Sequence, residues 1–410
     1  MRKPNLLDIE AARQRVLERA VPLPGEQVAL RDALGRRVCE DVESPEPLPG
    51  FDNSAMDGFA LRAADTSQAA AGEPVRLRLA GESRAGRPAA APLAPGEAFG
   101  ISTGAEMPAG ADTVLRLEDA SLDAEWLVVE RPVEPDRNVR HRGEDTLAGE
   151  RLLAAGTLLG PAELGLLASI GMPAVECHRR PRLAVLTGGD ELLEPGEPLR
   201  PGAIRNSNGY AVPALAQLAG AVTSVAAPAP DRADSVAAAL EPLLAADLVV
   251  CCGGVSVGEH DHVKQAFADL GIEESFWGVA LKPGKPTWFG SHGETLVFGL
   301  PGNPVSAMVT FLLFVRPALL ALAGGSPAAT RATAILDRRW PLRPERAQAL
   351  RCRLELGADG WHAEPFERQG SHMLTSMLGA DCLAMLPAGR GFAEAGDPVG
   401  VELLELGPGR

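Results

Sequence analysis

Three short apolar segments between residues 180 and 325 each run directly into a glycine-rich loop. They are RLAVLTGGDEL, DLVVCCGGVSVGE and TLVFGLPGNPVS, and the helical patterns GYAVPALAQLAG and RADSVAAALEPLLAA lie between the first and the second. Strands that alternate with helices in this way are typical of a parallel α/β sheet. Such sheets bind ligands beyond the carboxyl ends of their strands. We therefore expect the three loops to meet at one edge of a sheet.

The rest of the chain shows other patterns. Residues 6–20 and 161–171 have helical spacing, and Pro161 suits a first helical turn. Residues 50–140 alternate in short segments cut by glycine and proline, which predicts an all-β insertion. Residues 330–410 alternate without a long helix and predict a small β-barrel or sandwich. A chain of 410 residues with 46% apolar composition is expected to form three or four domains.

Charge and cysteine content limit the possible functions. A net charge of -15 argues against a general nucleic-acid or membrane-surface role. The six cysteines have no CxxC and no regular spacing, so a disulfide framework or a zinc site is not expected, and a reducing cytoplasm fits best. The longest apolar stretch, VSAMVTFLLFVRPALLALAG, is interrupted by Arg316 and Pro317, which favours a buried helix over a membrane span.

Two motifs predict an anion site. In GLPGNPVSA, Asn303 can cap a helix that begins at Pro304, and free N–H groups beside Gly302 would bind phosphate; a well-capped core helix with nothing bound fits equally well. The LKPGKP segment holds Lys282 and Lys285 on a stiff turn, in a chain with four lysines among 39 basic residues. Compact ammonium groups suit a phosphate or a tetrahedral oxyanion, although exposed surface lysines are the alternative.

Acidic residues follow the same strands. Glu259 and Asp261 in GGVSVGEHDHVK, and Asp190 and Glu191 in TGGDEL, are suited to a hard cation such as Mg²⁺ that holds phosphate oxygens. Asp261 could equally cap the following helix. The histidines that flank it lack a third ligand at helical spacing, which favours surface residues over a transition-metal site.

A polar loop far upstream, GFDNSAMDGFA at residues 50–60, contains Asp57, and RGEDTLAG contains Asp145. The first loop is not a calcium loop, because Met56 stands where an oxygen ligand belongs. Taken alone, it is best interpreted as a turn whose polar side chains satisfy their own backbone. The motifs together indicate a protein that handles a phosphorylated or adenylylated small molecule.

Six motifs follow one another along the chain: PGFDNSAMDGFA, RRPRLAVLTGGDELLEPGEPLRPGAIRNSN, GGVSVGEHDHVK, LKPGKP, GLPGNPVSA and QGSHMLTSM. Together they resemble the MoeA and gephyrin E-domain family of molybdenum cofactor synthesis, over nearly the whole chain. The resemblance implies a multi-domain α/β plus β fold and an elongated homodimer. The implied domains are a helical, extended N-terminal dimerisation domain (1–48 plus 141–178), a β-rich insertion domain (49–140), a molybdopterin-binding parallel α/β domain (179–327) and a C-terminal small β-barrel (328–410).

The implied reaction is the insertion of molybdate into the dithiolene of adenylylated molybdopterin, with Mg²⁺-dependent hydrolysis of the adenylate and release of AMP. The catalytic acids implied by the resemblance are Asp57, Asp145, Glu191 and Asp261, of which Glu191 and Asp261 would bind the metal. The implied substrate-binding residues are Thr103, Gly253, Gly254, Ser256, Lys282, Lys285, Pro301, Gly302, Asn303, Pro304, Arg351 and Ser371.

The resemblance also implies a cytoplasmic enzyme that makes transient contact with the molybdopterin adenylyltransferase and with acceptor molybdoenzymes. It further implies that Asp57 of one subunit completes the site of its partner. Four positions depart from the family pattern. Gly188 replaces the usual threonine before GDEL, and Asn206 stands where an aspartate is common. Arg232 replaces the second acid of a frequent Asp-Asp pair, and Gly278 stands where a basic residue often precedes KPGKP. The alternatives are the adenylylation step, which belongs to a shorter chain, a scaffold role, which would need an added upstream domain, and a copy that binds molybdopterin without turnover.

Overall fold

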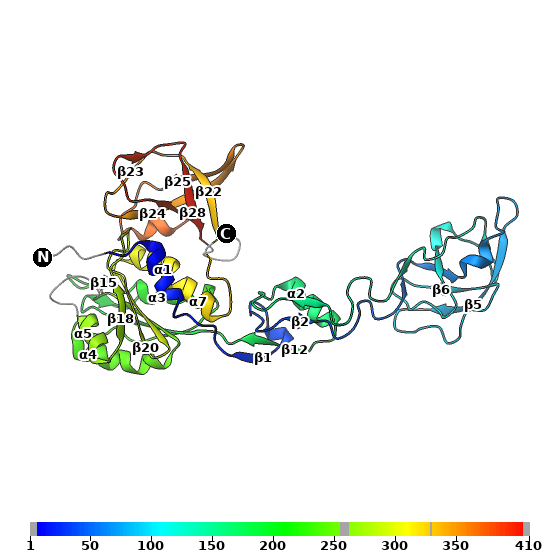
Figure 1. Cartoon of the computed structure of the whole chain (residues 1–410), viewed down its shortest axis with the longest axis horizontal. Helices are drawn as coiled ribbons and strands as arrows, with labels where there is room; N and C mark the ends of the chain where they lie inside the picture. The colour runs from blue at the N-terminus through cyan, green and yellow to red at the C-terminus, as the bar shows by residue number, and fades with distance from the viewer. Residues whose placement is uncertain (1–5, 255–261, 329, 405–410) are drawn as a thin grey trace.

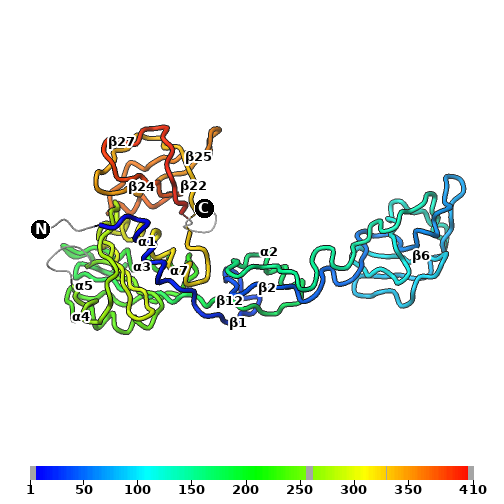
Figure 2. Tube along the Cα trace, in the orientation of Figure 1, coloured from blue at the N-terminus to red at the C-terminus, as the bar shows by residue number. Residues whose placement is uncertain are grey.

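The computed structural model describes residues 6–254, 262–328 and 330–404. The chain is elongated, with a large body at one end and a β-rich lobe at the other (Figure 1). Figure 2 shows the chain running out to the lobe through a narrow connecting region and returning beside itself. The outgoing and returning segments are paired there, since Leu48 bridges Thr146.

The large body contains the predicted α/β sheet, whose strand order is β16-β13-β17-β21-β20-β18. Strands β13, β16, β17 and β21 are parallel, whereas β20 and β18 extend the sheet in antiparallel pairing. A small pair of parallel strands, β14 and β15, lies beside it. The strands are β13 (Arg182–Thr187), β14 (Leu192–Leu193), β15 (Ile204–Arg205), β16 (Val222–Val225), β17 (Leu248–Cys252), β18 (Glu273–Trp277), β20 (Trp288–His292) and β21 (Thr295–Leu300).

Helices cover both faces of this sheet. Successive residues of a strand point to opposite faces, so each buried strand presents apolar side chains to the helices on both sides. Leu183 and Val185 of β13 join one hydrophobic cluster, and Ala184 and Leu186 join another. The first cluster includes residues of α3 (Asn208–Leu218), α6 (Pro304–Thr310), the π-helical turn η5 (Phe311–Val315) and α7 (Arg316–Leu322). The second includes residues of α4 (Ala233–Leu240) and α5 (His262–Asp269).

The segment Pro304–Leu322 forms one continuous helix of 19 residues. Among the described residues it is the one helix with the length and hydropathy of a membrane span, and 78% of its most apolar window is buried inside the protein. The predicted buried helix is therefore confirmed.

Helix α1 (Ile9–Leu17) packs on the large body of the molecule (Figure 1). Its buried residues Ala12 and Val16 belong to the hydrophobic cluster of the α/β region, and it contacts α7 and η5. Asp8 caps the helix by accepting a hydrogen bond from the N–H of Ala11 at 2.7 Å. The chain thus starts on the large body and leaves it after α1.

A closed five-stranded barrel forms the C-terminal region, as predicted: the sheet runs β24-β25-β22-β28-β26, and β26 pairs back with β24. One further strand, β19, joins β24 from outside and carries Lys282 of the lysine turn. The strands are β19 (Leu281–Lys282), β22 (Arg331–Leu336), β23 (Trp340–Pro341), β24 (Ala347–Gly357), β25 (Gly360–Pro365), β26 (Cys382–Leu386), β27 (Phe392–Ala393) and β28 (Pro398–Leu403).

The distant lobe is the predicted β-rich insertion, with a sheet in the order β7-β4-β6-β5-β9-β8. Its strands are β3 (Asn53–Ser54), β4 (Gly58–Leu61), β5 (Val75–Ser83), β6 (Glu97–Ile101), β7 (Thr113–Arg116), β8 (Ser121–Asp123), β9 (Trp126–Val129) and β10 (Val139–Arg140). The connecting region holds β1 (Gly25–Ala29), β2 (Val42–Glu43), β11 (Arg151–Leu153), β12 (Ala174–His178) and α2 (Pro161–Ser169), which begins at Pro161 as predicted. Short 3₁₀ turns are η1 (Leu30–Asp32), η2 (Ala63–Thr66), η3 (Leu117–Asp119), η4 (Glu241–Ala245) and η6 (Leu374–Met377).

Candidate functional site

A cavity of about 1070 Å³ lies beyond the carboxyl ends of β13, β17 and β21. Gly188 and Gly189 after β13, Gly253 and Gly254 after β17, and Gly302 after β21 all line it, so the three loops meet as predicted. Glycine is needed at position 253 for two reasons. Its φ is +97°, and a Cβ on Gly253 would lie 3.1 Å from the carbonyl oxygen of Gly188. Because these glycines lack side chains, an anionic ligand can approach the backbone of the loops closely at the edge of the sheet.

Two carboxylates line this cavity among the described residues, those of Glu191 and Asp231. The backbone N–H groups of Asp190 and Asp231 each donate to the other's carboxylate at 3.3 Å, which fixes the loop after β13 against residue 231. Gly189 leaves space for Glu191, because a Cβ there would lie 2.5 Å from a carboxylate oxygen. Ser256 and Asp261 lie outside the described residues.

The two described carboxylates that line the cavity suit a Mg²⁺ ion that is also held by a substrate. They do not suit a metal site that the protein forms alone. No group of three or more His, Cys, Asp or Glu residues gathers for a metal within the described ranges. Mg²⁺ is commonly held by one or two carboxylates together with substrate phosphates and waters. Glu191 and Asp231, which lie beside the glycine-rich loops of this cavity, fit that chemistry.

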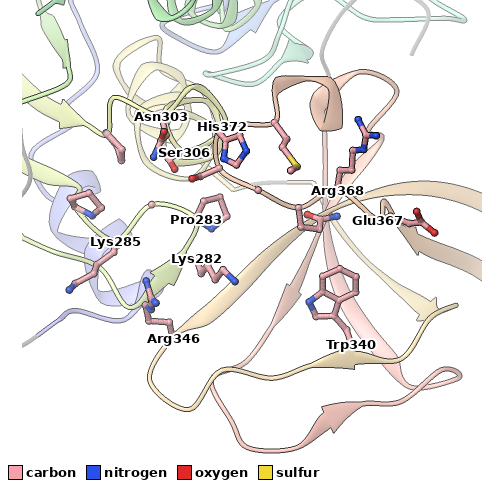
Figure 3. A pocket seen from close by; sticks show the side chains of 17 residues that line it. Lys282, Pro283, Lys285, Asn303, Ser306, Trp340, Arg346, Glu367, Arg368 and His372 are labelled. Carbon is pink, nitrogen blue, oxygen red and sulfur yellow. The ribbon is translucent and has the colours of Figure 1, made fainter. Parts of the chain in front are cut away.

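A second cavity of about 730 Å³ lies between the α/β region and the barrel (Figure 3). The α/β side contributes the lysine turn Lys282–Pro286 together with Asn303 and Ser306 at the start of α6, and the barrel contributes Trp340, Arg346 and residues 367–373. Lys282, Lys285 and Ser371, which were predicted from separate motifs, therefore line one cavity. Both lysines are half-buried, so their placement favours the predicted anion site over the alternative of two exposed surface lysines.

The lysine turn is fixed from two sides. Leu281 and Lys282 pair in parallel with Ala347 and Gln348 of β24. Gly284 has a φ of +119° and packs so close to α6 that a Cβ would lie 2.5 Å from Thr310 Cγ2. The hydroxyl of Thr287 donates to the carbonyl of Gly284 at 2.7 Å. The two ammonium groups are therefore presented from a backbone anchored to both the helix and the barrel.

The electrostatics of the second cavity favour an anion. Burial lowers the pKa of Lys282, and the positive charges of Arg343, Arg346 and Arg351 lower it further. A lowered pKa means that the charged form of the lysine is disfavoured where it stands. An anion in the cavity would reverse this effect by favouring the charged form.

The two cavities share one wall, which Pro286, Pro301, Asn303 and His372 line from both sides. Asn303 occupies the N-cap position of α6, but its side chain makes no capping hydrogen bond. The N–H of Val305 donates instead to the carbonyl of Ser371 at 3.1 Å. The predicted helix end is therefore partly occupied by the barrel, and it does not offer all of its donors to a phosphate.

Arg351 is not among the residues that line either cavity, because it is 1% exposed. Its Nε and Nη2 both donate to Ser376 Oγ at 3.1 Å, and Nη2 also reaches the carbonyl of Gly370 at 3.4 Å. Burial lowers the pKa of Arg351 to about 10. The guanidinium thus holds the loop that carries Ser371 and His372.

Asp57, Thr103 and Asp145 lie outside both cavities of the same chain. Asp57 directly precedes β4, which pairs with β6 in the distant lobe (Figure 1). Its Oδ1 accepts a hydrogen bond of 2.8 Å from the N–H of Thr103, which joins these two predicted residues in one exposed loop cluster. The N–H of Asp145 donates to Leu48 in the chain segments that lead to the lobe.

Two departures from the family pattern have clear structural reasons. Asn206 is buried, its Nδ2 donates to Thr187 Oγ1 at 3.1 Å and Glu194 Oε1 at 2.8 Å, and an aspartate would lack these donors. Gly278 has a φ of +91°, and a Cβ there would lie 2.7 Å from a methyl group of Leu6, so a basic residue would be strained at this position and would displace the Leu6 side chain.

The other two departures affect the rim. Arg232 pairs with Asp234 at 2.6 Å and lowers the pKa of that exposed carboxyl to about 2, so it adds no acid to the cavity. Gly188 has space for a side chain, since a Cβ there would meet its nearest neighbour at 3.7 Å.

Sequence reasoning missed several lining residues. Asp231 follows β16, whose loop has no glycine signal, and His372 was passed over for its neighbour Ser371. Trp340 and Arg346 come from the arginine-rich segment DRRWPLRPERAQAL, which has no distinctive spacing. The excess of positive charge in this segment is the one sequence feature that could have indicated Trp340 and Arg346 as lining residues.

Comparison with known protein families accounts for most of the chain. Residues 7–171 match the MoeA N-terminal region (domain I and II), residues 184–321 match a probable molybdopterin binding domain, and residues 333–404 match the MoeA C-terminal region (domain IV).

Curated relatives and solved structures extend this likeness. The chain is 36% identical over 406 residues to the molybdopterin molybdenumtransferase of Haemophilus influenzae, covering 97% of this chain and 98% of the relative. It is 35% identical to the enzyme of that name in Bacillus subtilis, covering 92% and 90% of the two chains. The crystal structure of a molybdopterin biosynthesis MoeA protein from Pyrococcus horikoshii matches with a TM-score of 0.85 at 33% identity, over 97% of this chain and 99% of that one.

Proposed function

The chain belongs to the MoeA family of molybdopterin molybdenumtransferases, and on that premise we propose that it inserts molybdate into the dithiolene of adenylylated molybdopterin. It is thus a transferase of molybdenum cofactor synthesis. The proposed reaction also hydrolyses the adenylate and releases AMP. The observation that carries the proposal is the pair of adjoining cavities, one glycine-rich and one cationic, with a common wall.

The cationic cavity is the proposed molybdate site. Lys282 and Lys285 would bind the tetrahedral dianion, and Ser371 would donate from the barrel. The cavity of about 730 Å³ exceeds what a single oxyanion needs, which leaves space for the end of the larger substrate that receives the metal.

The glycine-rich cavity is the proposed site of the adenylylated substrate. The N–H groups of Gly254 and Gly302 would contact the phosphates, and Pro301 and Pro304 would shape the wall toward the molybdate site. The N–H of Gly253 donates to the carbonyl of Leu300 at 3.0 Å, so Gly253 would contribute close approach of the backbone to the substrate and not a hydrogen bond. Asn303 and His372 lie in that wall and would face both substrates. This arrangement would hold the dithiolene and the molybdate close together, and such positioning is itself a large part of catalysis.

Magnesium fits the rim of the same cavity. Glu191 and Asp231 line it, and Asp261 is the further proposed ligand, although it lies outside the described residues. When bound there, Mg²⁺ would neutralise charge on the phosphoanhydride and favour attack by water at phosphorus.

We also propose that the enzyme works as a homodimer in which Asp57 and Thr103 of one subunit complete the cavities of the other. Asp145 would belong to the same added wall. The support is that all three are exposed and that none of them lines a cavity of its own chain. A cytoplasmic location, and transient contacts with the molybdopterin adenylyltransferase and acceptor molybdoenzymes, complete the proposal.

The test supplies the purified protein with adenylylated molybdopterin, molybdate and Mg²⁺. We expect AMP release that depends on both molybdate and Mg²⁺, and a product that restores activity to a cofactor-free molybdoenzyme. Omission of molybdate is the matched control. AMP release that is independent of molybdate, or no release at all, would contradict the proposed reaction.

A further inference from the structure

The cationic cavity contains a side chain that neither the sequence motifs nor the family resemblance assigned. We propose that Arg346, carried by the barrel, is the third cationic ligand of the tetrahedral oxyanion that Lys282 and Lys285 bind. This inference rests on the proposed function of that cavity. It places cationic ligands of the oxyanion on both sides of the junction between the α/β region and the barrel.

Backbone pairing fixes the position of Arg346. It directly precedes β24, whose first residue, Ala347, pairs with Leu281. The N–H of Ala347 also donates to the carbonyl of Ala280 at 2.8 Å. Arg346 is adjacent in sequence to Ala347, and Lys282 lies in β19, so pairing of the two strands keeps the arginine beside the lysine turn. In Figure 3 the guanidinium of Arg346 is drawn between the side chains of Lys282 and Lys285.

The charge of this group is not compensated within the described part of the chain. No ion pair joins Lys282, Lys285 or Arg346 to a carboxylate among the described residues, and Glu367, which lines the far side of the cavity, pairs with Arg338 at 3.4 Å. Glu345 is exposed and is not among the lining residues. Like charges held together by a rigid backbone raise the free energy of the folded protein, and a bound dianion relieves that repulsion.

Arg346 also has suitable chemistry and access. A guanidinium presents two parallel N–H groups to an oxyanion, which suits a tetrahedral dianion better than a third ammonium group would. Arg351, which the resemblance implies as a substrate-binding residue, is buried and donates to Ser376 and Gly370. Arg346 is half-buried and lines the cavity, so it can meet a ligand directly.

The experiment measures binding of sodium molybdate to the full-length protein by calorimetry, with AMP alone as a second arm, at about 150 mM salt so that remote charges are screened. The variants are Arg346→Ala and Arg346→Lys. Arg343→Ala is the matched control, because Arg343 also acts on Lys282 but is exposed and does not line the cavity. Melting temperatures establish that every variant is folded.

We expect Arg346→Ala to weaken molybdate binding by about tenfold or more, Arg346→Lys to restore part of the loss, and Arg343→Ala to change it by about twofold or less. A loss confined to AMP binding would also support Arg346 as an oxyanion ligand, but for the phosphate of the larger substrate. Equal effects of Arg346→Ala and Arg343→Ala on both ligands would overturn the inference and leave the proposed function intact. Failure of the wild-type protein to bind molybdate would overturn both.

Discussion

The N–H of Val305, in the first turn of α6, donates a hydrogen bond of 3.1 Å to the carbonyl oxygen of Ser371 in the barrel. This bond joins the helix that ends the glycine-rich rim to the loop that faces the lysine turn. Both partners lie beside the wall common to the two cavities. The orientation of the barrel relative to the sheet therefore determines the shape of the proposed site.

Arg351 is predicted to act through this loop rather than through direct contact with substrate. Arg351→Met removes the bonds to Ser376 and Gly370, but it also removes a buried cation whose charged form folding disfavours. The two effects oppose each other, so we expect the free energy of unfolding to change by about 1 kcal/mol or less. Molybdate affinity should fall about tenfold as Ser371 and His372 lose their support. Calorimetry and thermal unfolding would check this, and a large loss of stability with unchanged affinity would contradict it.

The Asn206 site predicts a stability difference that depends on pH. Hydrogen bonds from Asn206 and Tyr210 lower the pKa of Glu194, so this carboxylate stabilises the fold above its unfolded pKa and the contribution is lost as the pH falls through the folded value. Asn206→Asp places a second carboxylate there and should cost about 1–3 kcal/mol at pH 7. This loss of unfolding free energy should become smaller below about pH 5, where the new carboxylate and that of Glu194 together hold a proton.

Melting curves from pH 4 to 8 would measure this difference. The control is the double variant Asn206→Asp, Glu194→Gln, in which the glutamine amide can donate to the new aspartate and most of the stability should return. A difference between wild type and Asn206→Asp that stays constant with pH would show that repulsion is not its cause.

Two glycines offer a matched pair of substitutions toward the residues usual in the family. Gly278→Arg should lower the free energy of unfolding by about 1–2 kcal/mol, because its φ of +91° disfavours a side chain and Leu6 blocks the space. Gly188→Thr should be tolerated, because the nearest atom to its Cβ is 3.7 Å away. Thermal unfolding of both variants would check the contrast, and equal losses would contradict the assigned cause.

Subunit mixing tests the proposed role of Asp57. Asp57→Ala and Lys282→Ala should each inactivate the homodimer, because each removes one component of both sites. If Asp57 serves the partner subunit, a heterodimer of the two variants contains about one intact site. We expect AMP release from the mixture at a substantial fraction of the wild-type rate per heterodimer. No recovery in verified heterodimers would place both residues in the site of one subunit.

The local patterns of the sequence determined the elements and the rim. Each parallel strand with its glycine loop, and the helix from Pro304, is encoded by consecutive residues, and parallel strands necessarily bring their carboxyl ends to one edge. The motif with Lys282 and Lys285 likewise predicted an anion site, and both lysines line one cavity.

Tertiary structure alone decided which barrel residues face those lysines, that Arg351 is buried, and that α1 packs on the α/β region. The pairing of β19 with β24 joins residues 281 and 347 through a strand of two residues, which is too short to have a periodicity. It also set Arg346 beside the lysine turn and left Asp57 in the distant lobe, directly before β4. Contacts between segments so distant in sequence depend on how whole elements pack, and no local pattern records that.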